Sequence, residues 1–433
     1  MKRVLIIIYY WPPTSGSGVQ RWLKFTKHLR SYGWEPVIYT PENPYIHEQD
    51  ETLMKDIPDG IEVIRQPVFE VARYFGMPDK SVSGVGNVKT SIVSTIKKHI
   101  GNYVRGNLFI PDARISWVRP SVNYLLQYLK TNKVDAIVSS GPPHSLHLIA
   151  QNVTAKLGIP WLADFRDPWF EILNFHNFSI SASAYKKYEG LYKKVIQQAD
   201  VNVVAQGTVQ HSFQQHTPKP VTLITNGYDK DDMQPDGNVQ LDQSKFNLVF
   251  VGIFYAKRNP EAFWQALRQL IDEDAAFAAK CRLVFVGKGQ NDVMRDVVKY
   301  NLAEYCHFTG YVSHGSAVAY QMQASGLLLF TGIEPSFRHD VPGKLFEYLA
   351  AKRHIICIGQ PGSDAADIVT KTKAGYTVSY NNKEEIKAAI KQVYQKCISG
   401  NIVADTEDYE QYERKMLTKR MANELNRITS VYK

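Results

Sequence analysis

The hydrophobic positions of this chain form two successive series of short apolar runs separated by amphipathic stretches. In the first series the run Val4–Tyr10 ends in a Gly- and Ser-rich turn, and Val19, Trp22 and Leu23 then recur at a helical spacing. Strand, glycine turn, helix and strand in this order predict the opening unit of a doubly wound parallel sheet. The strands expected in this series are Val4–Tyr10, Pro36–Thr40, Ala136–Ser139, Trp161–Asp164, Val201–Val204 and Val221–Ile224.

A second series of the same kind follows, with helices expected at Pro260–Ile271 and Leu345–Ala351 between its strands. Because both series alternate strands and helices, we expect an α/β protein of two Rossmann-like, doubly wound parallel-sheet lobes that face each other across a cleft. The strands expected in the second series are Phe246–Val251, Arg282–Val286, His307–Phe308, Gly326–Phe330, His354–Ile358 and Gly375–Val378.

The length of 433 residues also favours two domains over one. The polar stretch Asp229–Ser244 separates the two series, so we expect an N-terminal lobe over 1–235 and a C-terminal lobe over 236–405. In the remaining segment, 406–433, Tyr409–Ile428 is predicted to be a charged amphipathic helix that packs back on the first lobe.

Composition excludes intrinsic disorder as the main state, because 44% of the residues are hydrophobic and only 21% are charged. The formal charge of +9 suggests attraction to anions such as phosphates, lipid head groups or nucleic acid, and its sign does not choose among them. The basic start and the apolar run Val4–Tyr10 lack a small-residue cleavage site, so a first strand is expected rather than a secretory signal. We therefore expect a cytoplasmic protein whose four cysteines are reduced thiols.

The segment richest in chemistry opens with Pro342-Gly343-Lys344 and continues into a helix. A helix start presents free N–H groups and a partial positive charge, so it can hold a phosphate, and Lys344 would add a full charge. Leu345 faces the sheet, whereas Glu347 shares another face with Lys344 and can accept hydrogen bonds from two vicinal ribose hydroxyls. The alternative is a solvated ion pair between residues three apart.

The run 342–351 resembles the donor-site signature of the GT-B glycosyltransferases of family 4, retaining enzymes that use nucleotide sugars. The resemblance implies that Pro342, Gly343, Lys344 and Leu345 bind the donor and that Glu347 binds its ribose. The first Glu of the family's Glu-x7-Glu motif falls at His339, which makes His339 the corresponding catalytic candidate, with its neighbour Asp340 or Glu334 as substitutes.

The resemblance extends along the second lobe. The segment 250–260 is similar to the loop in which the family grips the diphosphate with an Arg and a Lys. Arg258 matches the Lys position and Ile253 stands where the Arg is usual, so Lys257 and Lys344 are expected to restore the charge. The alternative for Arg258 and Lys257 is a pair of surface cations ahead of a helix. The turns at 286–289 and at Gly310 and Tyr311 are expected to border the nucleotide. Most glycine turns, however, serve only the fold.

In the first lobe, Gly16 and Gly18 occupy the place of the family's glycine-rich loop, which faces the distal phosphate and the acceptor; a simple tight turn is the alternative. Arg21 is either a further cation of the cleft or a surface residue. Two segments that follow strands, 139–147 and 164–169, look like those of a bacterial subgroup of the family. The resemblance implies catalytic-side roles for three polar residues, namely Arg166, Asp167 and His144. The alternative is an Asp–Arg pair that fixes the loop.

The resemblance thus implies a hexosyltransferase that uses a UDP- or GDP-linked sugar, needs no metal or other cofactor, and retains anomeric configuration. The expected acceptor is a glycan or a polyprenyl-diphosphate-linked sugar in cell-surface polysaccharide synthesis, and nucleic acid is not expected as a partner. A non-catalytic nucleotide-sugar-binding partner, or an epimerase or hydrolase of the same fold, stays open. An NAD(P)-dependent oxidoreductase is disfavoured because no Gly-x-Gly-x-x-Gly follows either opening strand.

The basic and aromatic stretch Lys97–Arg119 suggests a further partner, an anionic membrane surface on the inner face of the cytoplasmic membrane. It contains Tyr103, Arg105, Phe109, Arg114, Trp117 and Arg119. A solvated loop is the simpler alternative.

Overall fold

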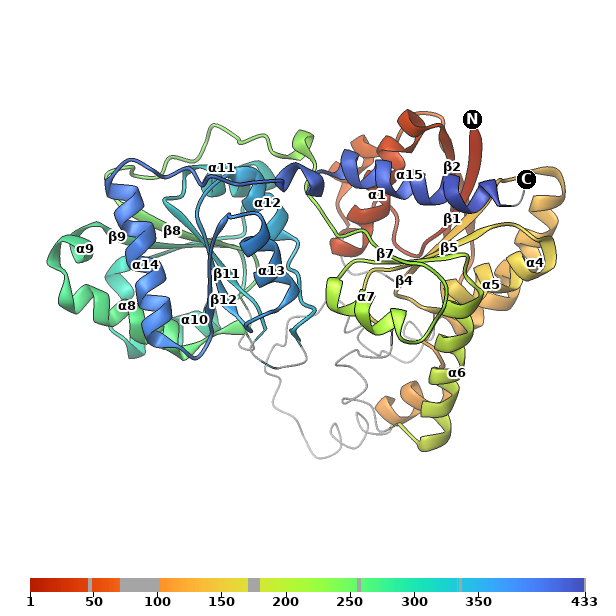
Figure 1. The fold of residues 1–433 in the computed structure, drawn as a ribbon, viewed down its shortest axis with the longest axis horizontal. Helices are drawn as coiled ribbons and strands as arrows, with labels where there is room; N and C mark the ends of the chain where they lie inside the picture. Colours follow the sequence, from red (N-terminus) through yellow and green to blue (C-terminus); the bar gives the residue numbers. More distant parts are fainter. Residues whose placement is uncertain are drawn as a thin grey trace. The chain divides into compact units, whose positions relative to one another are not determined.

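The computed structural model describes residues 1–45, 49–70, 101–169, 180–254, 258–332, 334 and 337–431 (Figure 1). The chain divides into two compact α/β units. Unit 1 comprises Met1–Thr225 and Arg414–Lys433, and unit 2 comprises Asn226–Glu413.

Unit 1 is built on a seven-stranded parallel sheet with the order β3-β2-β1-β4-β5-β6-β7. Its strands are β1 (Lys2–Ile7), β2 (Trp34–Pro41), β3 (Glu62–Gln66), β4 (Ala136–Gly141), β5 (Trp161–Phe165), β6 (Val201–Val204) and β7 (Val221–Leu223). Its helices are α1 (Ser17–Leu29), α4 (Ile115–Thr131), α5 (Ser145–Leu157), α6 (Ala182–Gln198), α7 (Gly207–Gln214) and α15 (Arg414–Ser430). In β1, Val4 and Ile6 belong to one core and Leu5 and Ile7 to another, because successive side chains of a strand point to opposite faces.

Strand β3 has no counterpart in the apolar runs of the sequence. It lies at the edge of the sheet beside β2, and of its five residues only Ile64 is buried. An edge strand that buries one side chain needs no apolar run, so hydrophobic patterning could not find it.

The C-terminal helix α15 packs on α1, and its buried residues Leu417, Met421 and Leu425 join the core that contains Trp22. The helix begins at Arg414 and not at Tyr409 as the sequence predicted, because residues Tyr409–Tyr412 form a separate 3-10 turn and Glu413 is extended. The regularly spaced apolar residues of α15 therefore pack into the same core of unit 1 as those of α1.

Unit 2 is built on a six-stranded parallel sheet with the order β10-β9-β8-β11-β12-β13. Its strands are β8 (Phe246–Val251), β9 (Cys281–Val286), β10 (Cys306–Gly310), β11 (Gly326–Phe330), β12 (Ile355–Gly359) and β13 (Gly375–Ser379). Its helices are α8 (Glu261–Glu273), α9 (Ala275–Lys280), α10 (Gln290–Lys299), α11 (His314–Gln323), α12 (Lys344–Ala351), α13 (Asp364–Lys371) and α14 (Lys383–Ile398). One core contains residues of α8, α10 and α14, and the other contains residues of α11, α12 and α13.

Each sheet reverses its strand order once, between β1 and β4 in unit 1 and between β8 and β11 in unit 2. At such a switch point the loops that follow the two strands leave in opposite directions, so ligands of doubly wound sheets bind there, outside the carboxyl ends of the strands. The segments that matter are therefore those after β1 and β4, and those after β8 and β11.

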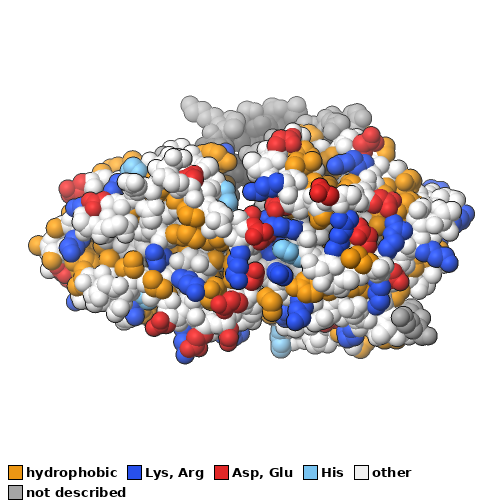
Figure 2. Space-filling view, turned by 90° about the horizontal axis from the view of Figure 1, so that it is seen from above, with side chains coloured by type: hydrophobic (Ala, Val, Ile, Leu, Met, Phe, Trp, Pro, Cys, Tyr) orange, Lys and Arg blue, Asp and Glu red, His pale blue; other side chains and the backbone are white. Residues whose placement is uncertain are grey.

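The surplus of positive charge is not gathered in one place on the face of the molecule shown in Figure 2, where Lys and Arg side chains are interspersed with Asp and Glu. Net charge alone therefore singles out no binding surface on that face. The candidate site has to be built from individual residues.

Candidate functional site

At the switch point of unit 2, Arg258 and Asp340 join the loop after β8 to the loop after β11. The distance between Arg258 Nη2 and Asp340 Oδ2 is 2.8 Å, and both side chains are partly buried. The cation expected to meet a diphosphate thus lies where doubly wound sheets bind ligands, and a carboxylate holds it there. Lys257, the other expected cation of this loop, lies outside the described residues.

Four residues after Asp340, helix α12 begins. Its N-cap Gly343 has no side-chain cap, and the N–H of Leu345 already donates to the carbonyl of Pro342 at 3.0 Å. Lys344 Nζ lies 3.2 Å from Oε1 and 3.0 Å from Oε2 of Glu347. The ion pair weighed as an alternative is therefore present, and it lies within the candidate site itself. Leu345 is fully buried on the core side, as the helical spacing predicted.

Glu347 has a further partner that sequence reasoning missed. Gln321 of α11 donates its side-chain amide to Glu347 Oε2 at 2.9 Å. Burial opposes ionisation of this carboxyl, but the charges of Lys344 and His314 and the hydrogen bond from Gln321 together hold its pKa below the ordinary value. The Glu347 side chain is therefore an anion at neutral pH, in the form that accepts hydrogen bonds.

The three residues weighed as replacements for the missing first Glu have different surroundings. Asp340 is paired with Arg258, whereas His339, partly buried beside it, forms no hydrogen bond or ion pair with the described residues. Glu334 is also partly buried. Among these three, Asp340 has its carboxylate beside the expected phosphate-binding cation.

The glycine turns after β8, β9 and β10 are bound to one another through the backbone. The N–H of Gly252 donates to the carbonyl of Val286, and the N–H of Gly287 donates to that of Gly310, each at 2.9 Å. A Cβ on Gly287 would lie 2.2 Å from the oxygen of Gly252, so no larger residue fits there. These close approaches of the backbone explain the glycines without any contact to a ligand. Gly310 itself has a φ of +69°, a conformation that favours glycine.

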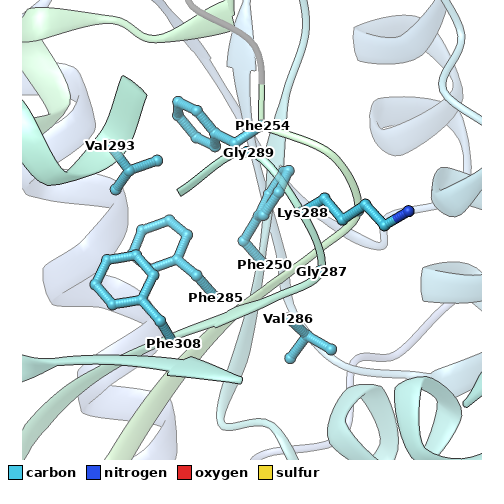
Figure 3. A pocket seen from close by; sticks show the side chains of 10 residues that line it. Phe250, Phe254, Phe285, Val286, Gly287, Lys288, Gly289, Val293 and Phe308 are labelled. Carbon is cyan, nitrogen blue, oxygen red and sulfur yellow. The ribbon is translucent and has the colours of Figure 1, made fainter. Parts of the chain in front are cut away.

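A small pocket lies among these turns, lined by Phe250, Phe254, Phe285, Val286, Val293 and Phe308 and by residues 287–289 (Figure 3). Its rings form the apolar floor beneath the glycine turns, and Lys288 points away from them (Figure 3). Arg258, Lys344 and Glu347 are not among the residues that line this pocket.

Tyr311 directly follows the last of these turns and is 80% exposed. Lys288 Nζ lies 5.4 Å from the centre of its ring, within the range of a cation–π interaction. An exposed aromatic face beside a lysine can stack on a nucleobase. The sequence indicated only that this glycine turn borders the nucleotide. The exposed ring of Tyr311 is a further feature of the candidate site, which the structure adds.

Near the switch point of unit 1, Arg166, which follows β5, connects the first turn of α1 to the loop after β4. Its Nη1 donates to the carbonyl of Gly18 at 2.8 Å and its Nη2 donates to that of Pro142. A Cβ on Gly18 would lie 2.7 Å from Arg166 Nη1, so glycine is needed for this approach, and Gly16 has a φ of +98°. Arg166 therefore has a structural function, and its positive charge stays at the carboxyl ends of the strands.

The Asp–Arg pair that fixes this region involves Arg21 and not Arg166. Arg21 is fully buried, and its Nη2 lies 2.8 Å from Asp164 Oδ1. Asp164 also accepts hydrogen bonds from the Trp22 indole and the Ser140 hydroxyl, at 2.8 and 2.7 Å. Both expectations for Arg21, a cation of the cleft or a surface residue, are therefore wrong, because spacing alone gave no sign of a buried carboxylate partner.

His144 and His147 are buried side by side at the start of α5. The ring of His144 stacks on Trp169 with 4.6 Å between centroids, and neither of its nitrogens has a hydrogen-bond partner among the described residues. Burial, His147 and Arg166 lower the pKa of His144 well below its ordinary value. His144 is therefore a neutral, enclosed ring, whereas the third residue expected here, Asp167, is exposed.

The orientation of His147 follows from a chain of hydrogen bonds. The Trp161 indole donates to Ser139 Oγ at 2.9 Å, and Ser139 Oγ lies 2.8 Å from His147 Nδ1. Within the described residues the hydroxyl hydrogen has no other acceptor, so it is donated to Nδ1 and the neutral ring carries its proton on Nε2. Burial and the charge of Arg166 lower the pKa of His147 to about 3.

Part of the stretch expected at a membrane is buried in unit 1. Arg114 and Trp117 are 5% and 1% exposed, and Arg114 Nε lies 3.5 Å from a Glu70 carboxylate oxygen. These two residues therefore cannot meet a membrane, whereas Tyr103 and Leu108 are more than half exposed, at 51% and 70%. In the part of the chain that the structure describes, no helix has the length and apolarity to cross a bilayer. Residues 97–100 lie outside that part.

Comparison with known proteins adds evidence at two levels. A model of the family described as "Glycosyl transferases group 1" matches residues 245–396, within unit 2, and no curated protein gives a significant match. The sucrose-phosphate synthase of Thermosynechococcus elongatus has a TM-score of 0.62 at 13% identity, over 100% of this chain and 97% of that chain. HepE of Anabaena, in complex with UDP and glucose, has a TM-score of 0.60 at 12% identity, over 99% and 100%.

A putative UDP-N-acetylglucosamine 2-epimerase from Listeria monocytogenes is also similar, with a TM-score of 0.56 at 9% identity, over 99% of this chain and 96% of that chain. Because enzymes of different reactions share this architecture, similarity at such identities shows the fold alone. The expected fold class is confirmed: the chain has the GT-B fold of two Rossmann-like units, and its second unit matches the group 1 glycosyltransferases.

Proposed function

We propose that this protein is a hexosyltransferase that uses a nucleotide-diphosphate sugar, UDP- or GDP-linked, as its donor. The observation that carries the proposal is the arrangement at the carboxyl end of the unit 2 sheet. There Arg258 is held at the switch point by Asp340, four residues before Lys344 and the N-terminus of α12, and the ionised Glu347 lies one turn further. Two phosphates and a ribose need cations and a carboxylate of this kind.

The chemistry follows from these charges. Departure of the nucleotide leaves negative charge on the diphosphate while positive charge develops at the anomeric carbon. Once the nucleotide is bound, Arg258 and Lys344 would stabilise the departing diphosphate from fixed positions, and this is the main way such a site lowers the barrier. Because these groups supply the positive charge, we propose a reaction that needs no divalent metal, and retention of anomeric configuration as in the family that the motif resembles.

The proposal is tested with the full chain and a panel of UDP-, GDP-, ADP- and CMP-sugars. A ligand that binds only the native protein raises its melting temperature, so thermal shift identifies the donor. Product analysis then follows with and without glycan and polyprenyl-diphosphate-linked acceptors, in the presence of EDTA. Arg258→Ala and Glu347→Ala should each lower transfer at least tenfold without unfolding the protein, whereas Arg268→Ala, from the ion pair with Asp272 on α8, should not lower transfer.

Each alternative has its own outcome in this experiment. An epimerase would interconvert the nucleotide sugar without acceptor, a hydrolase would release free sugar, and a non-catalytic partner would bind a nucleotide sugar without turnover. Transfer at the parent rate by both Arg258→Ala and Glu347→Ala would show that the site is elsewhere.

We further propose that the acceptor is presented at an anionic membrane surface, as expected in cell-surface polysaccharide synthesis on the inner face of the cytoplasmic membrane. The exposed Tyr103 and Leu108 are followed by Ile110, which packs against Ala184 and Tyr188 of α6, a helix with exposed Lys186 and Lys187. Exposed aromatic and apolar side chains on one segment, with basic side chains on the helix packed against it, favour binding to anionic lipid. Co-sedimentation with anionic but not neutral vesicles at low salt supports this, and Tyr103→Ser with Leu108→Ser should abolish it.

A further inference from the structure

Gln321 is a buried polar residue on the apolar side of α11. It continues the stripe formed by Ala317 and Val318 at the helical spacing, and it is 0% exposed. Burying an amide among apolar side chains is unfavourable unless the amide is hydrogen-bonded. A requirement beyond packing therefore has to account for a glutamine here.

That requirement is the carboxylate of Glu347 on the neighbouring helix α12. Gln321 Nε2 donates to Glu347 Oε2 at 2.9 Å, while Lys344 Nζ lies 3.0 Å from Oε2 and 3.2 Å from Oε1. A carboxylate oxygen accepts about two hydrogen bonds. Oε2 is therefore saturated by the protein, whereas Oε1 has capacity for one more donor.

The orientation of the Gln321 amide is fixed by the same contact. A carboxylate only accepts hydrogen bonds, so the amide nitrogen must face Glu347 and the amide oxygen must point the other way. That oxygen, Gln321 Oε1, is buried and has no hydrogen-bond partner in the part of the chain that the structure describes. The hydrogen bond from Gln321 Nε2 to Glu347 therefore leaves Gln321 Oε1 without a donor among the described residues.

We propose that Gln321 is a positioning residue for nucleoside recognition: it fixes the Glu347 carboxylate so that Oε1 accepts a ribose hydroxyl of the bound nucleotide. The inference rests on the proposed function, because it concerns the same site. It goes further in assigning a role to a residue of α11 and in naming the carboxylate oxygen that the nucleoside uses.

The test is calorimetric binding of UDP and GDP, and of their 2′,3′-dideoxy counterparts, to the full chain. Gln321→Met keeps the length of the side chain and removes the donor. It should weaken binding of the ribonucleotide about fivefold to tenfold, as expected for the loss of one hydrogen bond of ordinary strength. Binding of the dideoxy nucleotide should not change. In a Glu347→Ala background the same substitution should have no effect, because Gln321 acts through Glu347.

The matched control is Gln323→Met, on the same helix. Gln323 binds the main chain at Val239 and Leu241 and does not contact Glu347, so its loss should leave the preference for the ribonucleotide unchanged. Equal weakening of ribo- and dideoxy nucleotide binding by Gln321→Met would reduce Gln321 to a packing residue and overturn the inference.

Failure of the inference can be told apart from failure of the proposed function. If Glu347→Ala weakens nucleotide binding and Gln321→Met does not, only the role of Gln321 is wrong. If Glu347→Ala has no effect, the proposed site is wrong and the inference falls with it. Should Gln321→Met not fold, Gln321→Leu also removes the donor and suits the apolar side of α11. It must then lower the preference for the ribonucleotide, or the inference is overturned.

Discussion

Arg258 and Asp340 form an ion pair across the switch point of unit 2, with 2.8 Å between Nη2 and Oδ2. In unit 1 an arginine also lies at the carboxyl ends of the strands, but the guanidinium of Arg166, which follows β5, donates to the carbonyl oxygens of Gly18 and Pro142. The difference has a physical consequence. A carboxylate can be exchanged for another anion, such as a phosphate, whereas carbonyl oxygens hold a guanidinium without neutralising its charge.

The first prediction concerns this exchange. Asp340→Asn removes the anion that competes for Arg258, so the affinity for UDP or GDP should rise, by about fivefold if the pair contributes about 1 kcal/mol. Arg258→Ala should lower that affinity instead. Calorimetry measures both, and Asp272→Asn, which removes the partner of Arg268 on α8, is the control for a general change of charge. Weaker binding by Asp340→Asn would contradict the exchange.

The second prediction concerns the approach of Gly18 to Arg166. A methyl group at Gly18 would lie 2.7 Å from Arg166 Nη1 and 3.0 Å from the Tyr10 ring, so Gly18→Ala should displace the guanidinium. Arg166→Lys should have the same effect, because an ammonium cannot fork between two carbonyls. Each should lower transfer about tenfold to a hundredfold, and the double variant should be no slower than Arg166→Lys, within about a factor of two.

The control for Gly18→Ala is Gly190→Ala on α6, where a methyl group meets nothing within 4 Å. It should raise the stability of the protein slightly, by about 0.5–1 kcal/mol, because alanine restricts the unfolded chain. Additive losses in the Gly18→Ala, Arg166→Lys double variant would show that the two residues act separately.

The third prediction is a dependence of stability on pH. The pKa of His147 is about 3 in the folded protein, below its ordinary value of 6.5. Between these values the unfolded chain binds a proton that the folded chain does not, so the free energy of unfolding falls as the pH decreases below 6.5. The slope is about 1.4 kcal/mol per pH unit for this residue. His147→Asn, which keeps an acceptor for Ser139, should remove that slope.

This slope is measured by unfolding the protein in guanidinium at several pH values between 7 and 5 and following tryptophan fluorescence. Six of the seven tryptophans lie in unit 1, so the signal reports mainly on the unit that contains His147. His211→Asn, at an exposed histidine of α7, is the control and should leave the slope unchanged. Equal slopes for the parent and His147→Asn would mean that His147 does not carry this effect.

The fourth prediction concerns the exposed ring of Tyr311. If the ring stacks on the nucleobase, Tyr311→Ala should weaken nucleotide binding by about 1–2 kcal/mol, or about fivefold to thirtyfold, and Tyr311→Phe should retain it. Titration with UDP and GDP tests this. Tyr185→Ala, at a 48% exposed tyrosine of unit 1, should bind as the parent does. An alanine variant of Tyr311 with unchanged affinity would exclude stacking.

The sequence by itself determined the class of the fold and the positions along the chain of the residues that make up the candidate site. Buried parallel strands must be apolar on both faces, so β8 and β11 could be read from their apolar runs with the bounds that the structure gives. The helix that follows Pro342-Gly343-Lys344 could also be predicted, because it depends on local backbone conformation and residue spacing. The spacing of three residues likewise places Lys344 and Glu347 on one face of that helix.

Only the tertiary structure decided which charged and polar groups meet. Arg21 lies 143 positions from Asp164, Arg258 pairs with a residue of another loop, and Gln321 reaches Glu347 from a separate helix. None of these pairings can be predicted from a local pattern. Hydrophobic spacing predicts which face of an element is buried, but it does not predict which polar group from another element contacts that face. The buried state of His144 has the same cause: its neighbours Trp169 and His147 meet it only after the strand ends of unit 1 have been brought together.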